Sequence, residues 1–129
     1  MSKPKDTFTV LLAEDELFLS RTFENRLTLE GYTVLLAHDG EDAIQMILKE
    51  KPDLILLDLI MPKKNGFEVL EIIKKDELVQ HIPVIITSNL GQDSDIEKAM
   101  KLGAVDYIIK SNISLKDLAM KVKEHLPAK

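Results

Sequence analysis

The chain has 129 residues, 45% of them hydrophobic, a common size for one domain with enough apolar content for one buried core. Its 22 acidic and 17 basic residues give a net charge of −5, so we expect no direct contact with nucleic acid or a membrane. The absence of cysteine excludes disulfides, thiol catalysis and thiolate metal sites. Because there is no signal-peptide pattern and no apolar run long enough to cross a bilayer, we expect a soluble cytoplasmic protein.

Short apolar runs alternate along the chain with segments whose apolar residues recur at helical spacing. The first pattern is typical of buried strands and the second of amphipathic helices. The five expected strands are residues 8–13, 32–37, 54–58, 84–87 and 105–109. The expected buried faces of the five helices are Leu19, Phe23 and Leu27; Ala43, Ile44, Ile47 and Leu48; Val69, Leu70 and Ile73; Ile96, Ala99 and Met100; and Leu115, Leu118, Val122 and Leu126.

Turn-forming and capping residues predict where these elements begin and end, because proline, glycine and small polar side chains interrupt or cap helices. The predicted boundaries are a turn at Asp39-Gly40, a helix end at Lys51-Pro52, a strand start at Pro83, a helix cap at Asp93 or Ser94, a helix end at Gly103 and a helix cap at Ser114.

Five strands that alternate with five helices through short loops favour right-handed crossovers between parallel strands. The sequence therefore predicts a doubly wound (βα)5 sandwich of the flavodoxin-like type, a parallel five-stranded sheet with the strand order 2-1-3-4-5. No linker or repeat interrupts the pattern. We expect residues 1–129 to form one domain with a core of about residues 7–126 and short loose ends.

Asp58 is the anomalous residue of the third apolar run, LILLDLIMP, which covers residues 54–62. A charge is costly inside a buried strand, so we expect Asp58 where this strand reaches the carboxyl edge of the sheet. Open α/β sheets bind their ligands at that edge. Taken alone, Asp58 is equally consistent with a residue that caps a loop.

Polar residues follow four of the five expected strands, and parallel strands all end at one edge of their sheet. Three carboxylates brought together there repel one another and raise at least one carboxyl pKa unless a cation neutralises them. Oxygen ligands favour Mg²⁺, with Mn²⁺ or Ca²⁺ as alternatives, over zinc. The residues expected at this edge are Glu14, Asp15, Asp58, Thr87, Ser88 and Lys110.

Lys110 and Thr87 are suited to bind a phosphoryl group beside this cation, since an ammonium supplies positive charge and a hydroxyl donates a hydrogen bond. Asp58 would then be the nucleophile that forms an aspartyl-phosphate. Each residue also has a plainer interpretation: Lys110 as a solvated charge, Thr87 as ordinary strand composition and Asp15 as the cap of the first helix. Their joint placement at one edge favours the phosphate site.

Four segments in order resemble the receiver domain of two-component response regulators, including the single-domain chemotaxis type. Any one of these motifs is weak evidence, but all four in this order cover nearly the whole chain. They are LLAEDE at the end of the first strand, LILLDLIMPKKNGFEVL around the third, PVIITS at the fourth and DYIIK at the fifth.

The resemblance implies a role for each residue of the expected site. Asp58 is similar to the phosphoacceptor, and the chain is expected to catalyse no reaction beyond its own phosphorylation and dephosphorylation there. Glu14 and Asp15 resemble the acidic pair that holds Mg²⁺, with Asp58 and the backbone carbonyl of Ile60 as further ligands. Lys110 resembles the lysine that pairs with the phosphate.

The resemblance also implies a switch and partners. Thr87 resembles the switch hydroxyl and Tyr107 the switch aromatic, which taken alone would be half-buried core. A sensor histidine kinase or a histidine phosphotransfer protein would phosphorylate Asp58, and a downstream protein would meet the face of the fourth helix, fifth strand and fifth helix. The family implies a monomer or a phosphorylation-dependent dimer, acting as an effector, a relay or a phosphate sink.

The chain departs from the family pattern at several positions. Lys110 is followed by Ser111, where most receivers have a proline after a cis bond, and a cis bond costs about 2.5 to 4 kcal/mol before other residues. Ser88 stands in place of a commoner alanine and Asn65 in place of a commoner aspartate. Ile60 and Asn89 resemble the two variable positions that flank the phosphate and influence attack by water. Since Ile60 is apolar and cannot orient a water, we expect a moderately long-lived phosphate.

Three rival classes are consistent with parts of the sequence. A flavodoxin-like electron carrier has this architecture, but the acidic AEDE segment would repel a flavin phosphate. A phosphohydrolase of the haloacid dehalogenase type resembles a motif with a second acidic residue two positions after the nucleophile, where this chain has Ile60. A phosphorylation-independent interaction module stays open, although such proteins usually lose part of the residue set that this chain keeps.

Overall fold

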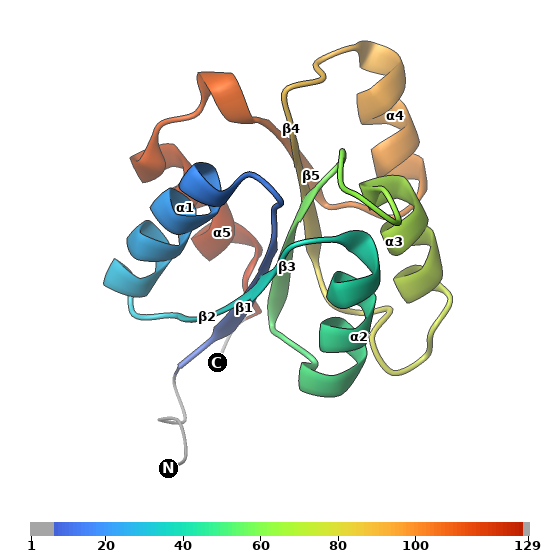
Figure 1. Ribbon diagram of the computed structural model, residues 1–129, viewed down its shortest axis with the longest axis horizontal. Helices are drawn as coiled ribbons and strands as arrows, with labels where there is room; N and C mark the ends of the chain where they lie inside the picture. The colour runs from blue at the N-terminus through green and yellow to red at the C-terminus, as the bar shows by residue number, and fades with distance from the viewer. Residues whose placement is uncertain (1–6, 128–129) are drawn as a thin grey trace.

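The computed structural model describes residues 7–127 and contains a parallel sheet of five strands in the order β2-β1-β3-β4-β5 (Figure 1). The predicted loose ends lie largely outside the described residues. The strands are β1 (Thr9–Ala13), β2 (Thr33–Ala37), β3 (Leu54–Asp58), β4 (Val84–Ser88) and β5 (Asp106–Ile109). The helices are α1 (Leu17–Leu29), α2 (Gly40–Glu50), α3 (Gly66–Lys74), α4 (Asp93–Lys101), the 3-10 turn η1 (Lys110–Asn112) and α5 (Leu115–His125).

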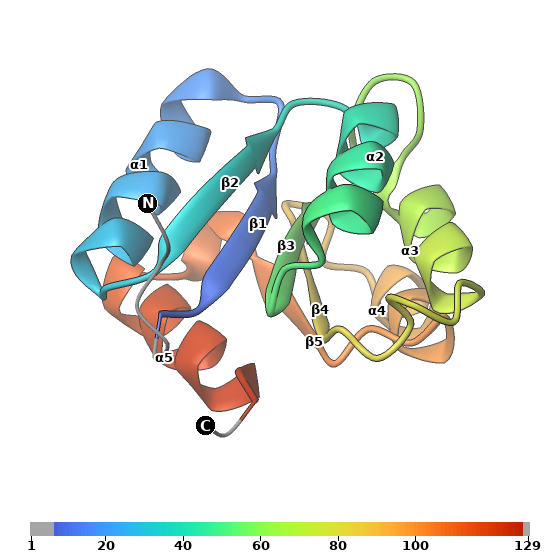
Figure 2. The ribbon, with the colours of Figure 1, turned by 90° about the horizontal axis from the view of Figure 1, so that it is seen from below.

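Helices cover both faces of the sheet and make three layers. Both ribbon views place α1 and α5 on one face and α2, α3 and α4 on the other (Figures 1 and 2). This arrangement confirms the predicted doubly wound fold and its strand order.

The central strand β3 shows how the sequence produces the two cores. All five of its residues are buried, and alternate side chains of a strand point to opposite faces. Ile55 and Leu57 accordingly join the core under α2 and α3, while Leu54 and Leu56 join the core under α1 and α5. Full burial of each such side chain stabilises the fold by roughly 1.5 to 3 kcal/mol, which explains why an apolar run forms this strand.

Two helix starts differ from the sequence prediction. The side chain of Glu16, and not Asp15, caps α1 by accepting hydrogen bonds from the amides of Phe18 and Leu19. Gln92, and not Asp93 or Ser94, precedes α4, and it makes no side-chain capping hydrogen bond. Helix starts were predicted from the preference for short polar side chains, and neither Glu16 nor Gln92 belongs to that group.

Asp39-Gly40 was predicted as a turn, but Asp39 caps α2 and Gly40 is the first residue of this helix. The Oδ1 atom of Asp39 accepts the amide of Asp42 at 2.8 Å. Ser114 caps α5 as predicted.

The predicted buried faces of the helices are correct at their centres and wrong at some edges. Phe23, Leu27, Ile47 and Leu118 are buried as expected. Met100 was assigned to the buried face of α4 but is 44% exposed. Ala99 is the only buried residue of that helix. Leu48 and Leu115 are also exposed. None of the helices within residues 7–127 is long and apolar enough to span a membrane.

Candidate functional site

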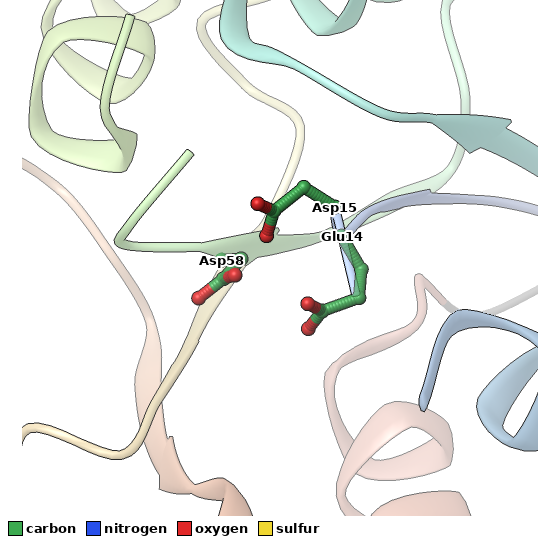
Figure 3. Close-up of side chains that lie close together, drawn as sticks. All are labelled: Glu14, Asp15 and Asp58. Atoms are coloured by element: carbon green, nitrogen blue, oxygen red, sulfur yellow. The ribbon is translucent and has the colours of Figure 1, made fainter. Parts of the chain in front are cut away.

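Glu14, Asp15 and Asp58 meet at the carboxyl edge of the sheet (Figure 3). Asp58 is the last residue of β3, and Glu14 follows β1, its direct neighbour in the sheet. The amide of Glu14 continues the pairing of β1 with β2 by donating to the carbonyl of Ala37 at 3.0 Å. One carboxylate oxygen from each acidic residue lies within 4.8 Å of the others. The predicted convergence of three carboxylates is therefore found.

These carboxylates form a donor set that fits a hard divalent cation. Glu14 is fully buried, Asp58 is 3% exposed, and Asp15 faces solvent. Magnesium takes oxygen ligands and usually keeps several waters, and the solvent-facing Asp15 leaves room for those waters. The residues present therefore fit a magnesium site.

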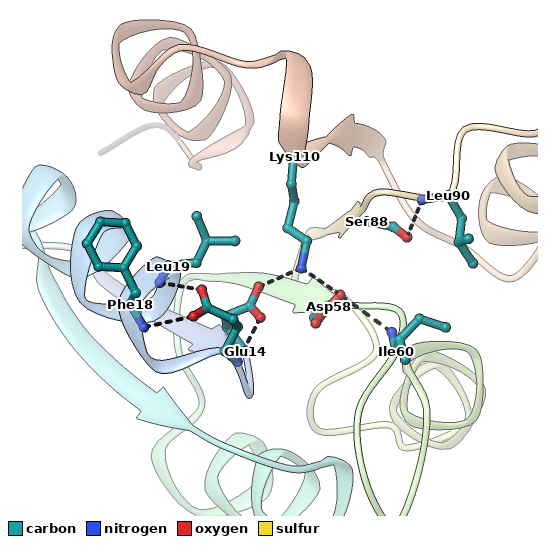
Figure 4. Close-up of polar contacts among 9 residues, drawn as sticks. Glu14, Phe18, Leu19, Asp58, Ile60, Ser88, Leu90 and Lys110 are labelled. Carbon is teal, nitrogen blue, oxygen red and sulfur yellow. Dashed lines mark hydrogen bonds and ion pairs between the residues drawn. The ribbon is translucent and has the colours of Figure 1, made fainter.

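Lys110 reaches across the sheet to the carboxylates from the residue after β5 (Figure 4). Its Nζ atom lies 2.9 Å from Oε1 of Glu14 and 3.2 Å from Oδ1 of Asp58. Only 10% of the Lys110 side chain is exposed, so one partly buried cation faces two buried anions. No cis peptide bond occurs among the described residues, so the Lys110-Ser111 bond is trans, and the lysine still reaches both carboxylates.

The charge balance of this cluster perturbs two pKa values. Burial and then the neighbouring charge of Glu14 raise the pKa of Asp58 to about 7, although Lys110 acts in the opposite direction. Burial tends to lower the pKa of Lys110, but its hydrogen bond with Glu14 and the charge of Asp58 outweigh burial and raise it. Lys110 is therefore held in its charged form, whereas Asp58 needs additional positive charge to be fully ionised near neutral pH.

Thr87 lies beside Asp58 because the two residues are paired in register on β4 and β3. Its side chain is fully buried, and its Oγ1 atom has no hydrogen-bond partner among residues 7–127. An unpaired buried hydroxyl costs free energy, and the hydroxyl of Thr87 is therefore free to donate to a ligand oxygen at the neighbouring Asp58.

Tyr107 contacts the loop that follows β4 through a hydrogen bond that the sequence did not predict. Its hydroxyl donates to the carbonyl of Leu90 at 2.5 Å, and the amide of Leu90 donates to Oγ of Ser88 at 2.9 Å. Burial raises the pKa of the Tyr107 hydroxyl. The extra hydroxyl of Ser88 therefore orders the β4–α4 loop, a role that depends on loop conformation and leaves no pattern in the sequence.

Ile60 borders the open pocket that contains the carboxylates. Its amide lies 3.4 Å from Oδ1 of Asp58, and its side chain is 61% exposed. The pocket has a volume of about 240 Å³ and is lined by Glu14, Asp15, Glu16, Asp58, Ile60, Ser88, Asn89, Leu90 and Lys110. Its polar side chains are carboxylates, one ammonium, one hydroxyl and the amide of Asn89, which suit a cation together with a small oxyanion.

The fold and this site define a class: doubly wound α/β domains with an acidic cluster and a lysine at the carboxyl edge of the sheet. The model of the response regulator receiver domain matches residues 10–123. The chain therefore belongs to the family of response regulator receiver domains, which are signalling domains of two-component systems.

Known relatives agree with this assignment. The chain is 37% identical over 114 residues to a Guillardia theta protein named "Probable transcriptional regulator ycf27", a match that covers 88% of this chain and 43% of the relative. The receiver domain of Francisella response regulator 1452 is 28% identical with a TM-score of 0.85, covering 92% of this chain and 95% of that one. The receiver domain of a histidine kinase from Syntrophus aciditrophicus is 28% identical with a TM-score of 0.85, covering 93% and 90%.

The curated relatives bear on the expectation, drawn from composition, that the chain has no nucleic-acid partner. The chain spans less than half the length of those it matches, between 43 and 47%. Because these relatives are named as transcriptional regulators, the expectation of no nucleic-acid partner is not supported.

Proposed function

We propose that this receiver domain carries a signal through phosphorylation of Asp58, with Mg²⁺ as the cofactor. The observation that best supports this is the buried Asp58 carboxylate, which Lys110 contacts at 3.2 Å while two further carboxylates lie beside it. Glu14, Asp15, Asp58 and the backbone carbonyl of Ile60 would hold the cation. When bound, the cation would neutralise the carboxylates and the phosphoryl oxygens.

Asp58 and Lys110 would have different roles in phosphoryl transfer. An oxygen of Asp58 attacks phosphorus, the new O–P bond forms, and the N–P bond of a phosphohistidine breaks, so that the electron pair stays on the imidazole nitrogen. Lys110 pairs with a phosphoryl oxygen and keeps its proton, because its pKa is raised. Positioning and charge neutralisation supply most of the rate enhancement in such transfers.

The Thr87 hydroxyl and the Tyr107 ring would report the phosphorylation to a partner-binding surface. The Oγ1 atom of Thr87 is buried without a hydrogen-bond partner within residues 7–127, so a phosphoryl oxygen on the neighbouring Asp58 offers it one. Tyr107 would exchange its hydrogen bond with Leu90 for a position nearer Thr87. Phosphorylation would then shift the face formed by α4, β5 and α5 toward its binding-competent state.

The phosphodonor would be a sensor histidine kinase or a histidine phosphotransfer protein, and a downstream protein would bind the α4-β5-α5 face. The chain would act as a monomer or as a phosphorylation-dependent dimer. The exposed, apolar Ile60 offers no group to orient an attacking water, so we propose a moderately long-lived phosphate. Loss of the phosphate within seconds of removing the donor would contradict this lifetime.

The test is incubation of the chain with Mg²⁺ and a small-molecule phosphodonor, followed by intact-mass spectrometry. We expect one phosphoryl group on the wild type, and none with EDTA or in Asp58→Asn. Asp53→Asn is the matched control, because Asp53 lies before β3 and accepts the amide of Thr9 at 2.7 Å, a bond that an asparagine oxygen can keep. Phosphorylation that persists in Asp58→Asn or without Mg²⁺ would contradict the proposal.

A further inference from the structure

Gly40, at the start of α2, packs directly against the β3–α3 loop (residues 59–65) that follows Asp58. The amide of Gly40 donates to the carbonyl of Pro62 at 3.2 Å. A Cβ atom on Gly40 would overlap the carbonyl oxygen of Lys64 and would lie 2.6 Å from its carbonyl carbon. Figure 2 shows the β3–α3 loop arching over this end of α2.

The need for glycine at position 40 comes from space and not from backbone conformation. Among the described glycines, only Gly31 and Gly103 have a positive φ. A residue with a side chain could therefore adopt the backbone of Gly40, but its Cβ would displace the backbone of Lys64. Close approach of two backbone segments is a second reason for glycine, distinct from its conformational freedom.

The middle of the β3–α3 loop has an unfavourable backbone conformation where it meets Gly40. Lys63 has a φ of 69°, which is unfavourable for a residue with a side chain. The amide of Lys64 donates to the carbonyl of Pro62 at 2.8 Å, the same carbonyl that Gly40 contacts. Lys63 Nζ lies 3.6 Å from Oδ2 of Asp39, the residue before Gly40.

The two ends of the loop are attached elsewhere, at the phosphoacceptor site. The amide of Leu59 donates to the carbonyl of Thr87 at 3.1 Å, and the amide of Gly66 donates to the carbonyl of Leu59 at 2.8 Å. Ile60 lies between this attachment and the contact with Gly40. The amide of Ile60 also lies 3.4 Å from Oδ1 of Asp58, so it is the direction of the Ile60 carbonyl that depends on where the middle of the loop rests.

We propose that Gly40 is a positioning residue of the phosphoacceptor site. By admitting the β3–α3 loop onto the start of α2, it fixes Ile60, whose carbonyl the proposed function assigns to the cation. This inference rests on that function for the identity of the cation, while the contact itself is independent of it. A side chain at position 40 moves Ile60 away and weakens cation binding without changing any carboxylate.

The main test compares Gly40→Ala with Gly103→Ala. Gly103 has a φ of 109° and lies at the opposite edge of the sheet, so alanine there strains the fold without touching the loop. Isothermal titration calorimetry with MgCl₂ measures the dissociation constant of each folded variant. We expect at least about tenfold weaker binding in Gly40→Ala, the usual effect of removing support for a metal ligand, and less than twofold change in Gly103→Ala. An unchanged Mg²⁺ affinity in folded Gly40→Ala would overturn the proposal.

Hydrogen exchange on the wild type gives a second test in case Gly40→Ala does not fold. Both the Gly40 and the Gly103 amides donate to backbone carbonyls, at 3.2 and 3.1 Å, so they form a matched pair. Mg²⁺ should slow exchange at Gly40 several-fold more than at Gly103. Equal slowing at the two glycines would overturn the proposal.

Failure of the proposed function would be recognised separately. If wild-type protein bound no Mg²⁺ and accepted no phosphoryl group, that function would be wrong. The metal-free amide chemical shift of Ile60 would then decide the inference: it should move in Gly40→Ala and stay in place in Gly103→Ala. No movement in Gly40→Ala would show that Gly40 does not position Ile60.

Discussion

Strand β5 carries a charged cluster at each of its ends, and the two clusters have opposite charge balance. At its carboxyl end, Lys110 faces Glu14 and Asp58, one cation against two buried anions. At its first residue, Asp106 accepts from Lys121 at 3.1 Å and lies 2.9 Å from Nε2 of His125, so that one anion faces two basic side chains.

The difference appears in the two aspartate pKa values. Burial and the charge of Glu14 raise the pKa of Asp58. Burial also acts to raise the pKa of Asp106, but the hydrogen bond with His125 and those with Tyr107 and Lys121 outweigh it and lower this pKa. The negative charge of Asp106 is compensated by the basic side chains around it, whereas Lys110 alone cannot compensate the carboxylates around Asp58. We interpret the surplus of buried carboxylates around Asp58 as the mark of a binding site, in contrast to the ion pairs of Asp106.

The largest difference between the two clusters should appear when the lysine of each is replaced by alanine. Lys110→Ala leaves two buried carboxylates without a cation, so we expect a loss of about 3 kcal/mol of unfolding free energy at pH 8. We also expect at least about 100-fold slower phosphorylation, because a charge that stabilises the transferred group is lost. Urea unfolding and the mass assay measure these effects. Lys121→Ala should leave phosphorylation unchanged, and equal slowing in both variants would contradict the comparison.

Asp58→Asn should stabilise the metal-free protein at pH 8. The folded-state pKa of Asp58 is about 7, above its unfolded value, so ionisation of Asp58 costs stability as pH rises from about 4 through about 7. We expect a gain on the order of 2 kcal/mol at pH 8 that shrinks toward zero near pH 4, measured by urea unfolding at several pH values. A variant less stable than wild type at pH 8 would show that Asp58 is already compensated.

Asp106→Asn should act in the opposite direction. The folded-state pKa of Asp106 lies below its unfolded value, so its stabilising contribution is present above the unfolded pKa and is lost as pH falls through the folded pKa. We expect a loss of about 1 kcal/mol or less at pH 7, since the cluster is partly exposed to solvent. Thermal unfolding at pH 7 and pH 3 measures the change, and a larger effect at pH 3 would be inconsistent with the assigned ion pairs.

Tyr107→Phe should have the smallest effect. Tyr107 lies between the two clusters in β5, and its hydroxyl makes a hydrogen bond to an uncharged carbonyl. Loss of the bond to Leu90 should cost about 0.5 to 1 kcal/mol, independent of pH between 4 and 8 in urea unfolding. A marked pH dependence would show that Tyr107 belongs to one of the charged clusters.

The parallel strands and the meeting of the carboxylates could be predicted because each depends on a pattern within the chain, whereas the strand order followed from the fold type that has this number of elements. Apolar runs such as 54–57 must form buried strands, and parallel strands place Glu14 and Asp58 at one edge whatever the details of the loops. The roles of Asp58 and Lys110 in phosphorylation stay predictions, because the structure gives their geometry and not their chemistry.

Features that depend on loop conformation could not be predicted. Gly40 looked like a turn residue because its neighbour in space, Lys64, lies far along the chain. Lys74 is similar: its Nζ atom donates to the carbonyls of Gln80 and Ile82, both at 2.9 Å, and burial lowers its pKa. Neither contact leaves a periodic pattern in the sequence, because each depends on how the segments pack in three dimensions.

The response of stability to Mg²⁺ tests most directly whether a cation supplies the missing charge at Asp58. Urea unfolding of the wild type and of Asp58→Asn at pH 8, at constant ionic strength and increasing Mg²⁺, gives the free energy of unfolding for each. The wild type should be stabilised progressively, as expected for a ligand that binds only the folded state, and Asp58→Asn should respond far less. An unresponsive wild type, or equal responses in both proteins, would contradict a cation site at Asp58.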